Sequence, residues 1–351
     1  MRAFEVNTPI LADYFYSIPT KIYNGNKNWS IQLGSDLDQI FNANKNSLIK
    51  SGNLKRWIVL DNWNNIAGRI SAFYSVQDDK KIKGGFGFFE CSENDEVAGY
   101  LLEVAIKWLT DQGCTSIEGP VNFGDKDRFW GLLTKGFDLP CLYLENYNPP
   151  YYEGMFKRFG LKEKDIINTY QVRLDQVPKQ RLKNVSDRLS ERYHIEFRKF
   201  SFDRLEDFVR DIHQVYINSF QQSTRFNLLE PEDICRLIIS IRPVISDDLI
   251  WLAYQNDTPI GLLAFMKDLN QIIMNSAGDK NLKGFAISVV PQFRKMGIEL
   301  GLAHSLYEAL ISKSTPYTLY FTGVNSNTSL MASFMKKLNA VICKTHKTFT
   351  L

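Results

Sequence analysis

Residues 289–301 read VVPQFRKMGIELG. Apolar, strand-like residues run into a proline, the two cations Arg294 and Lys295, and Gly297, after which helix-forming residues resume. A strand that leads directly into a helix brings unpaired backbone N–H groups together, and the helix dipole there favours an anion. The stretch therefore predicts either a phosphate-binding loop or only a basic turn, in which Glu299 complements the dipole.

The elements around this stretch occur in the same order in both halves of the chain. In the first half, a hairpin (56–75) precedes a strand (84–91), an amphipathic helix (96–113), a strand (115–123) and a short helix ending near Gly160. In the second half, the corresponding segments are 249–268, 283–290, 298–312, 317–324 and 327–338. The repeat predicts two copies of one α+β fold, each a mixed central sheet flanked by helices.

The charged segment 179–193, KQRLKNVSDRLSERY, reads as a helix with a solvated face. We expect it to connect an N-terminal domain over 1–178 to a C-terminal domain over 194–351. Residues 15–30 read as a loop-rich region, and a helix is expected around 35–50.

Composition limits the classes of partner. The 351 residues include 42 Lys and Arg against 39 Asp and Glu, with no dense basic run, so nucleic acid is not expected. No apolar stretch is long enough for a membrane span. The five scattered cysteines and four histidines show no metal-site spacing, so we expect no metal. We expect a cytoplasmic protein with reduced thiols.

The repeated order, together with Arg294 and Gly297, resembles the GNAT superfamily of acyl-CoA-dependent N-acyltransferases. These two residues match the superfamily's Q/R-x-x-G-x-G/A loop, whereas Glu299 stands where that loop has a small residue. The resemblance implies a second-half site for acetyl-CoA or another acyl-CoA, whose pyrophosphate the loop would bind. The cofactor-binding residues that it implies are Ile287, Val289, Arg294, Lys295, Met296, Gly297, Ile298, Glu299 and Asn327. A bulky side chain at 297 is expected to block the phosphate and leave the fold intact.

Two later residues bear on this resemblance. Asn327 resembles the superfamily asparagine that helps to hold the pantetheine arm, and it is also a good helix-capping residue. Phe334 falls where many members have a tyrosine that acts as general acid. Because phenylalanine has no transferable proton, that acid is missing.

The equivalent stretch of the first half, FGFFECSENDEVAGY (86–100), has a different charge. It carries Glu90, Glu93, Asp95 and Glu96, with no Arg, Lys or Gly between Glu90 and Gly99. Carboxylates at a helix start satisfy its N–H groups and repel a phosphate. We therefore expect the first half to have lost CoA binding.

Polar and aromatic residues gather in two Gly- and Pro-rich segments of the first half. If 119–131 and 145–152 fold toward one another, they would line a pocket for a polar or amine-bearing substrate. The alternative is that the tyrosines pack at a domain interface. The candidate substrate-binding residues are Asn122, Asp127, Tyr147, Asn148 and Tyr151.

No catalytic residue can be assigned from the sequence. Asp127, Glu145 and His304 are candidate bases for deprotonating an amine, although His304 lies within an amphipathic helix and suits a structural role.

Over residues 55–165 the chain resembles a group of bacterial GNAT-like proteins. The segments that carry this resemblance are GGFGFFECSENDEVA, IEGPVNFGDKDRFWGLL, KGFDLP and YNPPYYEGMFKRFGL. The leading expectation is acyl transfer, most simply of an acetyl group, to the amine of a small molecule or peptide. Two alternatives stay open: an aminoacyl or long-chain acyl transferase of tandem architecture, and a non-catalytic pair that binds a metabolite or a protein.

Overall fold

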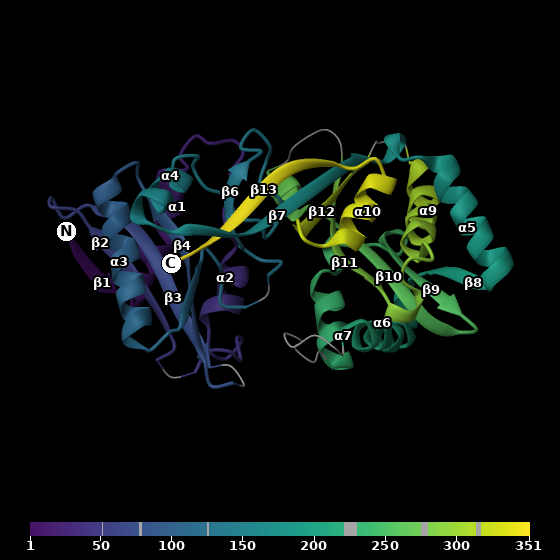
Figure 1. The fold of residues 1–351 in the computed structure, drawn as a ribbon, viewed down its shortest axis with the longest axis horizontal. Helices are drawn as coiled ribbons and strands as arrows, with labels where there is room; N and C mark the ends of the chain where they lie inside the picture. Colours follow the sequence, from purple (N-terminus) through teal and green to yellow (C-terminus); the bar gives the residue numbers. More distant parts are fainter. Residues whose placement is uncertain (51, 77–78, 125, 221–229, 275–279, 314–316) are drawn as a thin grey trace. The chain divides into compact units, whose positions relative to one another are not determined.

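The structure is a computed structural model that describes residues 1–351 except 51, 77–78, 125, 221–229, 275–279 and 314–316. The chain divides into two compact units (Figure 1). The first unit comprises Met1–Asn168 and Cys343–Leu351, and the second comprises Thr169–Ile342.

The first unit begins with strand β1 and two helices, followed by the predicted hairpin and strands. Its elements are β1 (Arg2–Glu5), α1 (Pro9–Ile22), α2 (Gly34–Phe41), β2 (Leu54–Leu60), β3 (Ile66–Val76), β4 (Ile82–Cys91), α3 (Asp95–Asp111), β5 (Ser116–Gly119), β6 (Leu132–Lys135) and α4 (Tyr152–Phe159). Strand β7 (Lys162–Arg173) begins in this unit and ends in the next.

The second unit repeats this plan. Its elements are α5 (Lys179–Tyr193), β8 (Ile195–Lys199), α6 (Leu205–Phe220), α7 (Pro231–Ser240), β9 (Ile250–Gln255), β10 (Thr258–Lys267), α8 (Leu269–Ile273), β11 (Lys280–Val289), α9 (Ile298–Ile311), β12 (Tyr317–Asn325) and α10 (Ser329–Lys337). The last strand, β13 (Val341–Thr350), begins here and ends in the first unit.

Each unit contains a mixed sheet, as predicted. The strand order is β1-β2-β3-β4-β5-β13 in the first unit, with β6 also paired to β13, and β7-β12-β11-β10-β9-β8 in the second. The pairs β4–β5 and β11–β12 are parallel, whereas the hairpins β2–β3 and β9–β10 are antiparallel.

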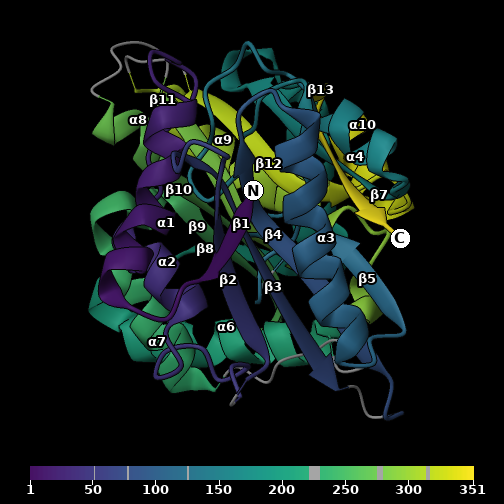
Figure 2. The same ribbon diagram turned by 90° about the vertical axis from the view of Figure 1, so that its left-hand side faces the viewer.

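Successive side chains of a strand point to opposite faces of a sheet, and in the first unit helices cover both faces. On β2, Trp57 and Val59 join the buried cluster that contains the α3 residues Leu101 and Leu102. Ile58, between them, packs with Phe15 of α1. Figure 2 shows α3 and α1 on opposite sides of these strands.

Two expectations about the first half and the linker were wrong. Residues 9–22 form helix α1, in which the Thr8 side chain accepts from the Leu11 N–H and Pro9 begins the helix. The segment reads as a loop in sequence because Pro19, which lies near the end of the helix, is a residue that usually interrupts helices. Segment 179–193 is helical, but Leu182 and Leu189 are buried in the second unit's core, so α5 is part of that unit and not a connector.

The expected domain limits also differ from the structure. The division falls at 168/169, and residues 343–351 complete the first unit, so neither 1–178 nor 194–351 is a compact unit. Burial of Phe349 explains this placement: its side chain is fully buried and contacts the Phe156 ring, with centroids 5.5 Å apart. The C-terminal strand therefore contributes core residues to the N-terminal unit.

Candidate functional site

The loop at 289–301 joins β11 to α9 in the second unit. After β11, a single 3-10 turn over Pro291–Phe293 precedes Lys295 at φ 69° and Gly297 at φ 99°. Gly297 is the N-cap of α9, so no capping side chain covers this helix start in the described chain. The first N–H groups of α9 consequently lack the side-chain acceptor that a Ser or Asp cap would supply.

Next to this loop, β11 and β12 separate. Their parallel register runs from Lys280 opposite Tyr317 to Gly284 opposite Phe321, while β11 continues to Val289 and β12 to Asn325. Among the described residues, the β12-facing edge of β11 beyond Gly284 therefore has no strand partner. The two strands are therefore splayed, and the splay exposes backbone hydrogen-bonding groups of β11 to a ligand.

Three cationic side chains surround the loop. The Arg294 guanidinium donates to the carbonyl oxygens of Val289 (3.0 Å) and Ser219 (3.2 Å). Arg188 of α5 donates to the Met296 carbonyl (2.9 Å), and Lys295 is exposed. The carboxylate of Glu299 lies 3.6 Å from the Lys337 ammonium of α10, which turns it away from the role of a cap. The loop therefore suits an anionic group.

Gly297 also has a packing role. A Cβ at this residue would lie 3.0 Å from Val185 Cγ1 and 3.6 Å from Arg188 Nη2, both on α5. The close approach at Gly297 is thus made by α5, a contact that the sequence did not reveal.

The other predicted cofactor residues lie in the same unit but differ in exposure. Ile287 and Val289 are half-buried on the splayed end of β11, Met296 is half-buried and Ile298 is buried. Asn327 is exposed and does not cap α10, because the N-cap is Thr328. Phe334 is buried against Phe321, with ring centroids 5.8 Å apart.

The first unit shows the same splay, but its strand edge is occupied. The β4–β5 register ends at Gly85 opposite Glu118. The Val121 N–H donates to the Phe86 carbonyl (2.7 Å), and the Cys91 N–H donates to the Tyr152 hydroxyl (2.7 Å). A ligand arm along this edge would have to displace these partners.

The start of α3 is also satisfied. The Asn94 side chain accepts from the N–H groups of Glu96 (3.0 Å) and Val97 (3.2 Å), and Asp95 pairs with Arg158 (2.6 Å). The expectation that carboxylates cap this helix is corrected in two ways: the capping side chain is the Asn94 amide, and Glu90 is not at the helix start but buried on β4.

Glu90 belongs to a buried cluster of ionisable groups. It lies opposite Arg69 in the β3–β4 register, and its Oε1 is 3.6 Å from Arg69 Nη2. Its Oε2 accepts from the hydroxyls of Tyr23 (2.7 Å) and Tyr152 (3.1 Å). Burial raises the pKa of the Glu90 carboxyl, against the opposing effect of the Arg69 guanidinium. Burial and the Glu90 charge raise the pKa of both tyrosines, which keeps them protonated as donors.

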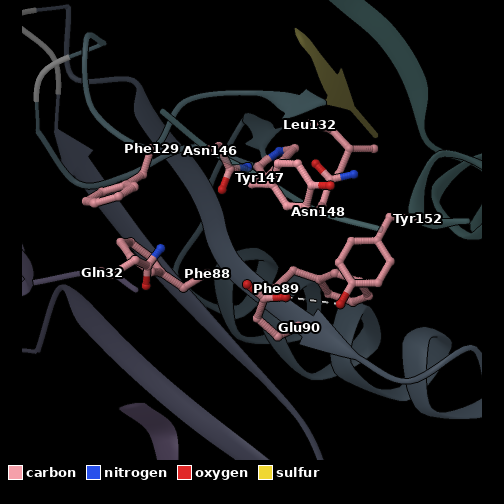
Figure 3. A pocket seen from close by; sticks show the side chains of 11 residues that line it. Gln32, Phe88, Phe89, Glu90, Phe129, Leu132, Asn146, Tyr147, Asn148 and Tyr152 are labelled. Carbon is pink, nitrogen blue, oxygen red and sulfur yellow. Dashed lines mark hydrogen bonds between the residues drawn. The ribbon is translucent and has the colours of Figure 1, made fainter. Parts of the chain in front are cut away.

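Glu90 and Tyr152 line a small pocket within the first unit (Figure 3). In Figure 3 the Glu90 carboxylate lies across this pocket from the amides of Asn146 and Asn148. The space inside is about 10 Å³, enough for one water-sized group. The lining residues are Gln32, Phe88, Phe89, Glu90, Pro120, Phe129, Leu132, Asn146, Tyr147, Asn148 and Tyr152.

The two Gly- and Pro-rich segments do meet at this pocket, since 119–131 supplies Pro120 and Phe129 and 145–152 supplies four of its residues, Asn146, Tyr147, Asn148 and Tyr152. Of the five candidate substrate residues, Tyr147 and Asn148 line it. The other three lie outside its lining. Asn122 donates to the Arg128 carbonyl, Asp127 is exposed near Arg128, and the Tyr151 hydroxyl donates to the Cys91 carbonyl (3.1 Å).

The candidate bases are held in different environments. Glu145 forms a buried ion pair with Lys344, which with nearby His346 holds the pKa of the carboxyl below its usual range. His304 lies 3.6 Å from Glu308, one turn along α9. Asp127 stays largely exposed. Glu145 is thus held in a structural ion pair. Among the described contacts, neither Asp127 nor His304 lies against a group that could take part in a reaction.

Gln32, which lines the pocket, and Arg69, which contacts Gln32 and Glu90 behind it, were missed by sequence reasoning. Arg69 donates to Gln32 Oε1 (3.2 Å) and to the Phe15 carbonyl (3.0 Å), and its side chain is fully buried. A signal existed: Arg69 interrupts an apolar strand, and pairing the hairpin with the next strand places it opposite Glu90.

Two further properties concern the described residues as a set. No group of three or more His, Cys, Asp or Glu side chains in them is arranged to hold a metal ion. Nor does any helix in those ranges combine the length and apolar character needed to cross a bilayer.

No family model matches the chain. Protein YghO of Escherichia coli (strain K12) is 22% identical over 268 residues, which cover 75% of this chain and 67% of that protein. The bacterial ceramide synthase of Caulobacter vibrioides is 20% identical over 283 residues, covering 79% and 73%.

Among solved structures, the glucosamine N-acetyltransferase region of a fungal multi-domain β-N-acetylglucosaminidase superposes with a TM-score of 0.61 at 13% identity. The match covers all of this chain and 38% of that one. A tandem GNAT protein from the clavulanic acid biosynthesis pathway gives a TM-score of 0.57 at 8% identity, covering 100% and 98%. The fold is that of the GCN5-related N-acetyltransferase superfamily. More particularly, it is the tandem form, with two such folds in one chain.

Proposed function

We propose that the chain is an acyl-CoA-dependent N-acyltransferase whose second unit binds the acyl-CoA. In this reaction the amine nitrogen forms a bond to the thioester carbon, the carbon–sulfur bond breaks, and CoA leaves as a thiol with a proton that the amine gives up. The acceptor is an amine of a small molecule or peptide, and the proposed location is the cytoplasm.

The single observation that carries this proposal is the pairing of two features in the second unit. The splayed edge of β11 offers backbone groups for the pantetheine arm, and the Gly297-capped start of α9 offers N–H groups for the pyrophosphate. Arg188, Arg294 and Lys295 would add positive charge there. In the first unit both equivalent places are filled.

The length of the acyl group is a separate question. The solved tandem GNAT protein shares the fold and does not distinguish between acyl groups. The relative named ceramide synthase makes, by that name, a lipid in which a long-chain acyl group is joined to an amine. That name favours amine acylation, and it favours an acyl group longer than acetyl.

Calorimetric titration with acetyl-CoA, octanoyl-CoA and palmitoyl-CoA tests the proposal. We expect one of them to bind, and Lys295→Asn to weaken binding about tenfold, through loss of one charge-assisted hydrogen bond of ~1.5 kcal/mol. Asparagine tolerates the positive φ of Lys295. Lys80→Asn is the matched control, because Lys80 is also exposed at positive φ (62°) but lies in the first unit. Absence of binding by all three would exclude the proposal.

A non-catalytic pair of folds is the second candidate. The buried Phe334 in place of an acid and the ion-paired Glu145 favour it. An assay of CoA release with a panel of amines, performed with an acyl-CoA shown to bind, separates the two. Binding without release above the uncatalysed rate would support the non-catalytic candidate.

A further inference from the structure

Two side chains that line the small pocket of the first unit, Glu90 and Asn146, have hydrogen-bond acceptor capacity left for a ligand. A carboxylate accepts about four hydrogen bonds, and the described contacts of Glu90 are two hydroxyl donors at Oε2 and the 3.6 Å ion pair at Oε1. The Asn146 amide donates to the Gly131 carbonyl (2.6 Å), so its oxygen is the end left to accept. A group that donates several hydrogen bonds suits this pocket.

An apolar groove adjoins the pocket through Gln32, which lines both. The groove has a volume of about 230 Å³, and its walls include Pro19, Trp29, Ile31 and Leu37. Ile31 is 52% exposed, although it is a large apolar residue. All these residues belong to the first unit, and Gln32 separates the polar pocket on one side from the apolar groove on the other.

We infer that the first unit binds a single-chain amphipathic amine, with its ammonium group at Glu90 and Asn146 and its hydrocarbon chain in the groove at Trp29, Ile31 and Leu37. The water-sized pocket fits a primary ammonium group and excludes a bulky head. The inference deepens the proposed function, because this amine would be the acceptor of the acyl group.

The charges in the pocket favour an amine over an anion. An anionic head would meet the Glu90 carboxylate, and the Arg69 guanidinium that could compensate is already directed to Gln32 and Phe15. An ammonium group would give Glu90 a second cationic partner beside Arg69, in a place where burial strengthens the attraction. A neutral alcohol would gain hydrogen bonds without this attraction.

The test is calorimetric titration of the full chain, without any CoA, using hexylamine, octylamine, decylamine, 1-decanol and decanoate below their aggregation concentrations. We expect affinity to rise about threefold for each added methylene. We also expect decylamine to bind at least tenfold more tightly than decanol or decanoate. Equal binding of the three ten-carbon ligands would overturn the assignment of Glu90, and affinity independent of chain length would overturn the assignment of the groove.

Two variants locate the site. Glu90→Gln keeps an acceptor for both tyrosines and should lower decylamine affinity at least tenfold, whereas Glu103→Gln, on the exposed side of α3, should not change it. Ile31→Ser should weaken decylamine several-fold with little effect on hexylamine, and Ile10→Ser, which is also exposed (66%) but lies outside the groove, serves as its control. Unchanged decylamine binding by Ile31→Ser contradicts the inference even if Glu90→Gln does not fold.

These outcomes are independent of the acyl-CoA titration. If the amine binds and no acyl-CoA binds, the first-unit site is supported and the proposed function is excluded. If an acyl-CoA binds and the amine does not, the proposed function is supported and this acceptor site is excluded.

Discussion

Gly297 is needed by the fold as well as by any ligand. Its φ of 99° is unfavourable for other residues by about 1–2 kcal/mol, and a Cβ would press on Val185. We expect Gly297→Ala to lower the free energy of unfolding by that amount, measured by urea denaturation followed by circular dichroism. Gly99→Ala, in the middle of α3 with open space around the new Cβ, should instead raise it by about 0.5–1 kcal/mol.

The close approach of α5 to Gly297 corrects the expectation that a bulky side chain at 297 would leave the fold intact. Loss of CoA binding in such a variant would not separate a blocked phosphate from a displaced α5. Lys295→Asn is therefore the sharper variant, since that side chain is exposed. A Gly297→Ala protein as stable as the original chain would show that α5 moves aside at no cost.

Glu299 stands where the superfamily loop has a small residue, yet its carboxylate lies near Lys337 of α10. Because this pose leaves the helix start open, we expect Glu299→Ala to change acyl-CoA affinity by no more than about threefold, or ~0.7 kcal/mol. Calorimetry with the acyl-CoA that binds best measures the change. A gain of tenfold or more would mean that Glu299 competes with the phosphate in solution.

At the scale of elements, β13 stabilises the first unit through a buried ion pair. Lys344 on this strand pairs with Glu145 and donates to the Pro140 carbonyl (2.6 Å), and the Lys344 side chain is 1% exposed. Removing one partner leaves a buried charge, so Lys344→Met should lower the free energy of unfolding by about 3–5 kcal/mol. Urea denaturation followed by tryptophan fluorescence measures the loss.

Two comparisons test the cause of that loss. The double variant Lys344→Met/Glu145→Gln should recover much of the stability, because it leaves no unpaired charge. Lys107→Met breaks the exposed pair with Asp111 and should cost less than about 0.5 kcal/mol. A double variant no more stable than Lys344→Met would instead assign the loss to packing.

The elements that the sequence predicted are those with strong local patterns. The hairpins, the strands over β4 and β11, and helices α3 and α9 follow from apolar periodicity and turn residues. The assignment of 343–351 to the first unit did not follow, because it depends on Phe349 fitting a distant core at Phe156. Likewise, α1 was missed because Pro19 reads as a breaker, although it lies near the end of the helix, where Phe15 and Ile18 are buried.

For the candidate site, too, the sequence indicated the residues with local patterns and not their distant contacts. The motif drew attention to Arg294 and Gly297, but their contacts with Ser219 and Val185 join segments far apart in sequence. In the first unit, local composition indicated Tyr147 and Asn148, whereas the pocket also requires Gln32 and Glu90 from other elements. Residue type and spacing do not specify which distant side chains meet.

At the scale of the whole molecule, one fold occurs twice with two different uses of the same strand edge. In the second unit the edge of β11 beyond Gly284 is left without a strand partner in the described chain. In the first unit the equivalent edge of β4 is bonded to Val121 and Tyr152. The same strand edge is thus open in one unit and hydrogen-bonded in the other, and Glu90 and Tyr152 beside the bonded edge line the small polar pocket.

This division predicts where an acyl-CoA will protect the backbone from hydrogen exchange. A ligand bound at the β11 edge and the α9 start would accept hydrogen bonds from N–H groups there, so peptides covering 285–301 should exchange more slowly when the acyl-CoA is present. Peptides covering 86–100 should be unchanged, because Tyr152 and Asn94 already accept from N–H groups in that segment. Mass spectrometry at short labelling times measures both regions in one experiment, and Lys295→Asn should reduce the protection at equal ligand concentration. Protection at 86–100 without protection at 285–301 would place the acyl-CoA in the first unit and reverse the assignment of the two halves.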